Sequence, residues 1–174
     1  SCFDEKAKNI QGMLRAVREV ANERQDFELV LVGTGVDFEQ DIAYAQTLDF
    51  PKDMLTFTGE QTPHEVAQWM QQSDCFLFFS RYENAPVVLS ECLAVGLPII
   101  SSNAGGIPEM INHECGILVP SEDEDALAKA LLHMLDRTTI YDIATIRSYG
   151  KQYTYASIGR QLSKLSQGLI VSSH

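Results

Sequence analysis

Two glutamates lie where the chain changes from an apolar run to a helical pattern. Glu83 follows the apolar run at residues 75–79, and Glu91 lies eight residues farther on, inside the helical pattern. Because helical side chains lean back toward the start of their helix, Glu91 can point toward the same opening as Glu83. A carboxylate accepts hydrogen bonds from neighbouring hydroxyls such as those of a ribose, at about 1.5–3 kcal/mol each. The pair therefore suits a ligand that carries a sugar diol.

The start of the same helix can bind an anion. Asn84 or Ala85 can be its N-cap, Pro86 fits its first position, and Gly96 fits its end. The first helical turn offers amides without an intrahelical acceptor and the positive end of the helix dipole. A ligand that carries hydroxyls next to phosphates would fit both features, and a sugar nucleotide is such a ligand. The alternative interpretation, that acidic residues near a helix start only complement the dipole, stays open on these residues alone.

The surrounding sequence alternates apolar, β-rich runs with helical patterns. Runs that are apolar on both faces indicate parallel strands covered on both sides. They lie at residues 28–33, 54–59, 75–79, 98–101 and 116–120. This alternation predicts an α/β fold with a doubly wound, mainly parallel, Rossmann-like sheet. Such sheets bind ligands at the carboxyl ends of their strands, which is where Glu83 lies.

The helices are expected from apolar periodicity and capping signals. Apolar residues recur at helical spacing from Ile10 to Val20. A capping box spans Thr62 to Glu65, with Pro at the first helical position, and a second spans Ser121 to Glu124. A last amphipathic helix is expected at about residues 156–169.

Composition is that of an ordinary globular domain and excludes several classes of protein. The 174 residues suit one domain, and the hydrophobic content of 45% excludes disorder as the main state. A formal net charge of −11 leaves no basic footprint, so we expect no nucleic-acid partner. No apolar run approaches the ~18 residues of a membrane span. The four cysteines form no Cys-x-x-Cys motif, which predicts reduced thiols in a cytoplasmic protein.

A longer series of motifs runs in order along nearly the whole chain. It comprises Lys8–Asn9, Val32–Gly35, Thr58–Gly59, Ser80, Glu83, Glu91–Cys92, Gly96–Pro98, Gly105–Glu109 and Gly116–Val119. In this order the motifs resemble the C-terminal, nucleotide-sugar-binding domain of B-fold glycosyltransferases of group 1 (family four). No single motif is specific, but the ordered set is. The resemblance implies that the sheet is one half of the glycosyltransferase B fold.

The resemblance also implies roles for individual residues. Glu91 corresponds to the glutamate that holds the ribose diol, and Glu83 to the one that positions the hydroxyls of the donor sugar. Lys8 corresponds to the lysine that neutralises the diphosphate, so Glu83 and Lys8 are the expected catalytic residues. The other donor-binding positions are Asn84, Ala85, Val87, Val88, Gly33, Thr58 and Gly59. The family is retaining and uses no metal or other cofactor, because Lys or Arg and a helix dipole meet the charge of the leaving group.

The organisation of the family predicts what this chain does. We expect residues 1–174 to be one donor-binding C-terminal domain, whose helix at 156–169 packs toward an absent N-terminal acceptor domain. The whole enzyme is expected to transfer a sugar from an NDP-sugar to a glycan or lipid-linked acceptor. Its setting is expected to be bacterial cell-surface polysaccharide synthesis, in the cytoplasm or at the inner face of the cell membrane. The start at Ser1, without Met, fits a fragment that binds the donor without transferring the sugar.

One departure from the family pattern keeps other functions open. An Arg usually precedes the family's Lys by about five residues, whereas Phe3 stands there, or Cys2 with an insertion. Lys6 is a candidate substitute, and Arg81 is either a donor contact or a loop residue. The alternatives are therefore a sugar-nucleotide epimerase of the same fold or an inactive nucleotide-binding or assembly module.

Two other motifs suggest different chemistry. Gly33 and Gly35 begin a dinucleotide fingerprint, but Phe38 stands at the third glycine position, so NAD binding is not expected. Asp123 to Asp125 is an Asp-x-Asp sequence of the kind that holds a metal in A-fold transferases. At the start of a helix, these carboxylates are expected to complement the dipole instead, and no metal site is predicted.

Overall fold

The fold is a parallel α/β arrangement, as the sequence predicts. The computed structural model describes residues 3–137, 139–154 and 157. The strands are β1 (Leu29–Val32), β2 (Leu55–Gly59), β3 (Phe76–Phe78), β4 (Ile99–Ser102) and β5 (Gly116–Val119). The helices are α1 (Glu5–Lys8), α2 (Ile10–Glu23), α3 (Phe38–Thr47), α4 (Pro63–Gln72), α5 (Val87–Val95), α6 (Ile107–Met110), α7 (Glu124–Leu135) and α8 (Ile143–Gly150), followed by a 3-10 turn at Lys151–Tyr153. Apart from Ser157, the helix expected at residues 156–169 lies outside the described residues.

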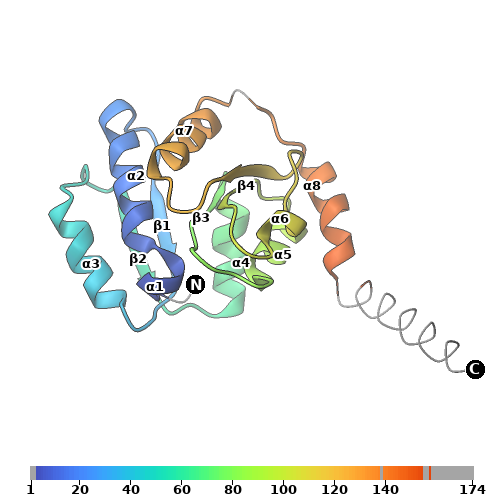
Figure 1. The fold of residues 1–174 in the computed structure, drawn as a ribbon, viewed down its shortest axis with the longest axis horizontal. Helices are drawn as coiled ribbons and strands as arrows, with labels where there is room; N and C mark the ends of the chain where they lie inside the picture. Colours follow the sequence, from blue (N-terminus) through green and yellow to red (C-terminus); the bar gives the residue numbers. More distant parts are fainter. Residues whose placement is uncertain (1–2, 138, 155–156, 158–174) are drawn as a thin grey trace, which may run out of the picture.

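The strands form two parallel sheets that lie edge to edge (Figure 1). One sheet pairs β1 with β2, and the other has the order β3-β4-β5. Within the described part of the chain, no ladder joins β1 to β3. The fold therefore has two parts, and the carboxyl ends of β1, β2 and β3 lead into loops where the sequence places residues of the candidate site.

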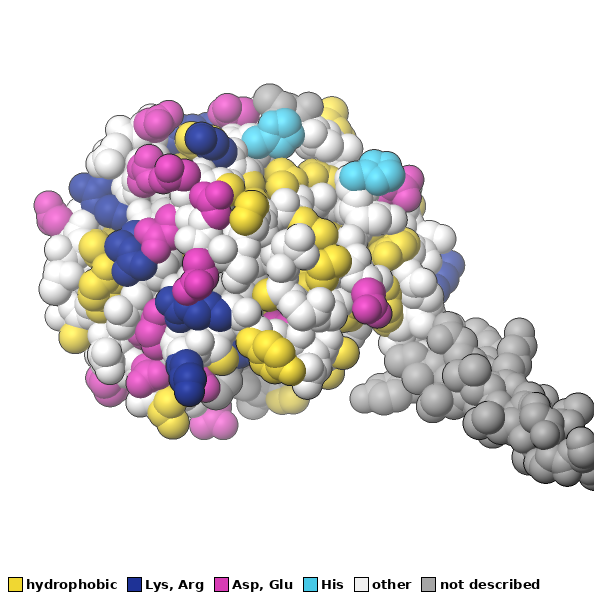
Figure 2. Space-filling model, in the orientation of Figure 1, with side chains coloured by type: hydrophobic (Ala, Val, Ile, Leu, Met, Phe, Trp, Pro, Cys, Tyr) yellow, Lys and Arg dark blue, Asp and Glu magenta, His cyan; other side chains and the backbone are white. Residues whose placement is uncertain are grey.

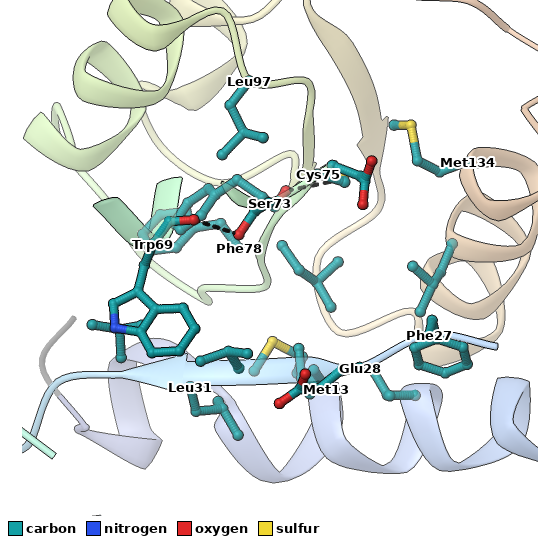
Figure 3. A pocket seen from close by; sticks show the side chains of 18 of the residues that line it. Met13, Phe27, Glu28, Leu31, Trp69, Ser73, Cys75, Phe78, Leu97 and Met134 are labelled. Carbon is teal, nitrogen blue, oxygen red and sulfur yellow. Dashed lines mark hydrogen bonds between the residues drawn. The ribbon is translucent and has the colours of Figure 1, made fainter. Parts of the chain in front are cut away.

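A cavity of about 880 Å³ separates β1 from β3. Its walls are mainly apolar and include Met13, Leu31, Trp69, Phe78 and Met134. Figure 3 shows Trp69 extending from α4 toward β1, with Met13 and Leu31 on the opposite wall. Lys8 also lines this cavity, so one end of it reaches the candidate site.

Two helices hold the two sheets together. The buried face of α2 carries Leu14, Val17 and Val20, and α2 packs side by side with α7 (Figure 1). The same apolar cluster contains Leu31 of β1 and Ile100 of β4. Burying each such side chain contributes about 1.5–3 kcal/mol, so this cluster is the main connection between the two parts.

The helix starts agree with the sequence in one case and differ in two. The capping box of α4 is confirmed, because Thr62 and Glu65 cap one another reciprocally. The box predicted at 121–124 is wrong: α7 is capped by Asp123, whose carboxylate accepts the Ala126 N–H at 2.9 Å. Glu122 takes a left-handed φ of 63°, so the helix can begin only after it, and Glu124 instead pairs with Arg15 at 2.5 Å.

The start of α5 is one residue later than predicted. Its N-cap is Pro86, in an extended conformation with ψ of 114°, rather than Asn84 or Ala85. Proline has no N–H and suits either position, so its presence alone could not fix the boundary. The predicted end is confirmed, because Gly96 is the C-cap with a left-handed φ of 79°.

Candidate active site

Lys8 and Glu83 meet at the junction of the two sheets. Lys8 ends α1, and its ammonium donates a hydrogen bond to Glu83 Oε1 in the loop after β3. The Lys8 Nζ also lies 5.2 Å from the centre of the Phe78 ring. The side chains of Lys8 and Glu83 are only 19% and 11% exposed. The structure thus pairs the two residues that the sequence predicts to be catalytic, although they lie 75 positions apart.

The Gly105–Gly106 turn supports the loop that carries Glu83. The Gly106 N–H donates to the Glu83 carbonyl at 3.0 Å. A Cβ at Gly105 would overlap that carbonyl oxygen, and one at Gly106 would overlap the carbonyl of Asn84. Gly105 also has a left-handed φ of 54°. Only glycine fits this approach, a role that the motif alone did not reveal.

The first turn of α5 follows Glu83 directly. In the described chain no side chain caps this helix end, and Val87 at its first position is 66% exposed. Asn84 and Ala85 are exposed before it, and Glu91 is exposed one turn farther on. Val88 faces the cavity. Glu83, the amides at the start of α5 and the Glu91 carboxylate therefore lie along one short segment, and Lys8 of α1 pairs with its first residue.

The remaining predicted residues lie at the carboxyl ends of β1 and β2. The Gly33 N–H donates to the Gly59 carbonyl at 2.9 Å, and the Thr58 hydroxyl donates to the same carbonyl at 3.0 Å. This turn connects to the α1 segment, because the Phe3 N–H donates to the Thr34 carbonyl at 3.1 Å. The predicted Gly33, Thr58 and Gly59 thus form one group and Lys8, Glu83 and the α5 start another.

The turn after β1 is packed against protein. A Cβ at Gly35 would overlap the backbone of Phe3, which accounts for this glycine without a phosphate. Phe38 packs edge-on against Phe3, with ring centres 5.0 Å apart. Phe3 itself is 1% exposed, whereas Lys6 is exposed. The position at which the family's Arg is expected is thus occupied by a buried aromatic ring.

Acidic side chains surround the α1 segment. The Glu5 N–H donates to Asp37 Oδ2 at 2.9 Å, and Gln11 donates to Asp41 Oδ1 at 3.2 Å. Burial raises the pKa of Asp41 from 3.8 to about 6, with Glu5 and Asp37 adding to the rise and the Gln11 hydrogen bond opposing it. Figure 2 shows basic and acidic side chains interleaved over the half of this face that carries α2 and α3.

The described residues contain no group of three or more His, Cys, Asp or Glu side chains arranged to bind a metal ion. Asp123 and Asp125 of the Asp-x-Asp sequence lie at the start of α7, where Asp123 is the cap. Cys75, Cys92 and Cys115 are free thiols, and burial raises the pKa of each.

Comparison with known proteins identifies the family. A family profile described as "Glycosyl transferases group 1" matches residues 2–137. The chain belongs to the group 1 glycosyltransferases. It is 33% identical to the amylovoran biosynthesis glycosyltransferase of Erwinia amylovora, over 73% of this chain and 33% of that protein. It is also 33% identical to the N-acetyl-alpha-D-glucosaminyl L-malate synthase of Bacillus anthracis, over 75% of this chain and 33% of that protein.

Solved glycosyltransferases share the fold. A lipopolysaccharide outer core galactosyltransferase superimposes with a TM-score of 0.84 at 21% identity, over 94% of this chain and 46% of that one. An Anabaena protein solved with UDP superimposes with a TM-score of 0.83 at 18% identity, over 97% of this chain and 47% of that one. This group 1 chain thus spans about a third of its curated relatives and under half of these structures. Among its described helices, none is long and apolar enough to cross a membrane.

Proposed function

We propose that this chain is the donor-binding part of a retaining glycosyltransferase that uses a nucleoside diphosphate sugar. The Lys8–Glu83 pair beside the start of α5 carries the proposal, because it combines a cation, a carboxylate and helix amides at the carboxyl ends of the strands. The Anabaena neighbour was solved with UDP and also with UDP-glucose, which supports a sugar nucleotide as ligand.

Each group has one task in this proposal. Lys8 neutralises the diphosphate and exchanges its bond to Glu83 for one to the phosphates when the donor enters. Glu83 then accepts hydrogen bonds from the donor sugar, and Glu91 accepts them from the ribose diol. The amides at the start of α5, from Asn84 to Val88, face the sugar and diphosphate, except Pro86, which has no N–H. The turns at Gly33 and at Thr58–Gly59 border the nucleoside.

The bond to the leaving diphosphate breaks with electrostatic help from the protein. Negative charge grows on the diphosphate as the sugar departs, and Lys8 and the α5 dipole are positioned to stabilise it. No metal ion is needed in this scheme. A further part of a longer protein binds the acceptor, which we propose to be a glycan or a lipid-linked glycan of a surface polysaccharide. The names of the relatives, which include amylovoran and colanic acid biosynthesis, support that substrate class.

Isothermal titration tests the proposal directly. The chain is titrated with UDP, GDP and ADP and with their glucose or mannose conjugates. One nucleotide should bind. Glu91→Ala should reduce the affinity for that nucleotide about 10- to 100-fold through the loss of one or two charge-assisted hydrogen bonds. Glu114→Ala is the control and should bind as the parent does, because Glu114 is an exposed acidic residue in the turn before β5, at the amino ends of the strands. Equal losses in both variants, or no binding of any nucleotide by the parent chain, would contradict the proposal.

One observation favours a second candidate. The buried Phe3 stands where the family's Arg is expected, so the diphosphate loses one cation. An assembly module that has lost catalysis would keep this fold. Such a module would bind neither nucleotides nor their sugar conjugates, so the same titration separates the two functions.

A further inference from the structure

Arg81 lies in the loop after β3 and binds helix α1 on both sides of Lys8. Its backbone N–H donates to the Ala7 carbonyl at 2.8 Å. Its guanidinium donates to Asn9 Oδ1 at 2.6 Å, to the Glu5 carbonyl, and to Glu5 Oε1 at 3.3 Å. The residues before and after Lys8, and the first residue of its helix, are therefore all held by one side chain and its backbone.

Helix α1 needs such support because it is a single turn. It has four residues, and a helix of this length is not stable by itself in water. It ends at Asn9, which has a left-handed φ of 52° and is 1% exposed. The Asn9 side chain lies so close to Gly12 that a Cβ there would overlap it. The bond from Arg81 to Asn9 thus fixes the point at which α1 turns into α2, and with it the direction of Lys8.

The sheet cannot fix the position of Lys8 relative to Glu83. Lys8 precedes the β1–β2 part and Glu83 follows β3, and within the described residues no ladder connects β1 to β3. The α2–α7 packing joins the two parts, but among the described residues no side-chain hydrogen bond or ion pair links α2 or α7 to Lys8 or Glu83. At the site itself, Arg81 is a direct link between them, and its Nε also donates to Glu122 at 2.6 Å in the turn before α7.

We infer that Arg81 is a positioning residue for the donor site, which holds Lys8 against the Glu83 loop without touching the donor. Its guanidinium is already engaged by Glu5, Asn9 and Glu122. The rigid fork of arginine can reach these separate acceptors at once, which a lysine cannot do. Removal of Arg81 should therefore release α1 and disorient Lys8 while the rest of the fold persists.

Lysine labelling tests the positioning without any ligand. The chain is treated briefly with an amine-reactive ester, and modification at each lysine is measured by mass spectrometry. Lys52, 92% exposed, is the internal standard. Arg81→Ala should raise the labelling rate of Lys8 several-fold relative to Lys52. Arg24→Ala is the matched control, because Arg24 is 28% exposed against 31% for Arg81 and also joins distant segments through Asp136.

The labelling result decides the inference in either direction. Unchanged labelling of Lys8 in Arg81→Ala, or an equal rise in Arg24→Ala, would overturn it. Arg81→Gln keeps a shorter, uncharged polar side chain and is used in the same way if the alanine variant does not fold. This readout does not depend on nucleotide binding, so a failure of the proposed donor function would leave it intact.

A double-mutant cycle separates positioning from direct contact and rests on the proposed function. Arg81→Ala should weaken UDP or GDP binding, whichever the chain shows, and leave the nucleoside unchanged. In the Lys8→Ala background, the same substitution should cost less than about twofold, because Lys8 is already gone. Additive losses would show that Arg81 contacts the phosphates itself, and equal losses for nucleoside and nucleotide would show a general effect on the fold. Either result would overturn the inference.

Discussion

At the scale of single residues, removal of the Lys8 ammonium should weaken binding of the diphosphate and leave binding of the nucleoside unchanged. Lys8→Ala should weaken nucleoside diphosphate binding about 10- to 100-fold, the worth of one charge-assisted hydrogen bond, and leave the nucleoside unchanged. Calorimetry with UDP and uridine, or the corresponding guanosine pair, measures both. The control is Lys6→Ala, because Lys6 lies on the same helix turn but is exposed. An equal loss at Lys6 would mean that Lys6 replaces the family's Arg.

Glu83 should act on the sugar rather than on the nucleotide. In the structure the Glu83 carboxylate pairs with Lys8, so in the proposed function it becomes available to the sugar when the diphosphate takes over the lysine. Glu83→Gln should therefore reduce the affinity for the NDP-sugar by a larger factor than the affinity for the NDP. Titration of both ligands into the variant checks this difference. If the two affinities change equally, Glu83 does not contact the sugar.

At the scale of elements, substitution of Gly105 should destabilise the fold, because the Gly105–Gly106 turn packs closely against the Glu83 loop. Gly105→Ala combines a strained left-handed φ with an overlap against the Glu83 carbonyl. The matched control is Gly59→Ala, because Gly59 also has a positive φ, of 71°, but open space around its Cβ. We expect about 1 kcal/mol for Gly59→Ala, or roughly 2–4 °C in Tm, and at least twice that for Gly105→Ala. Equal shifts in thermal unfolding would show that the loop simply moves away.

Helix α3 carries a buried carboxylate that should make stability depend on pH. Asp41 is fully buried and Oδ2 has no hydrogen-bond partner in the described structure, which fits its raised pKa of about 6. The folded state then binds this proton more tightly than the unfolded state, whose pKa is near 3.8. Stability from this group is therefore present below about pH 4 and lost as the pH rises through 6.

Asp41→Asn should remove that loss. The free energy of unfolding of the variant should exceed that of the parent by up to about 3 kcal/mol at pH 8, from roughly two pKa units, and by little at pH 4. Urea unfolding between these pH values measures the difference. Asp53→Asn, 83% exposed, is the control and should show no such trend. A constant difference for Asp41→Asn would mean that Asp41 stays charged in the fold.

The strands and the longer helices could be predicted from sequence because their signals are local. Each predicted apolar run overlaps one strand of the structure, and the Thr62 box and Gly96 mark real helix ends. The box at Ser121 failed because two acceptors compete within three residues and only the backbone angle of Glu122 decides between them. The gap between β1 and β3 depends on contacts across the whole chain, which no local pattern carries.

Some features of the candidate site could likewise be predicted from the sequence, and others could not. The order of motifs predicted Lys8 and Glu83, and the structure pairs them. The role of Gly105 became visible only from the carbonyl that it faces. Arg81 stayed undecided between donor contact and loop, because its acceptors on α1 are more than 70 positions away.

At the scale of the whole molecule, the two-part sheet should govern local stability. β4 pairs on both sides, with β3 and with β5, and all four of its residues are buried. β1 pairs only with β2 in the described structure, and a cavity of about 880 Å³ separates it from β3. Amides open locally where few buried contacts and ladder bonds hold them. We therefore expect amide hydrogens of β1 and β3 to exchange faster than those of β4.

Donor binding should reduce this difference. A nucleoside diphosphate that contacts Lys8 and the start of α5 spans both parts. A ligand that binds the folded arrangement more tightly than a locally opened one stabilises the folded arrangement by mass action. Hydrogen exchange, followed by mass spectrometry on peptides that cover β1, β3 and β4, should slow in β1 and β3 when UDP or GDP saturates the chain. The nucleoside alone lacks the phosphates that reach Lys8 and should have a smaller effect. Slower exchange in β1 than in β4 without ligand would contradict the expected difference in local stability. Identical effects of nucleoside and nucleotide would show that the site does not connect the two sheets.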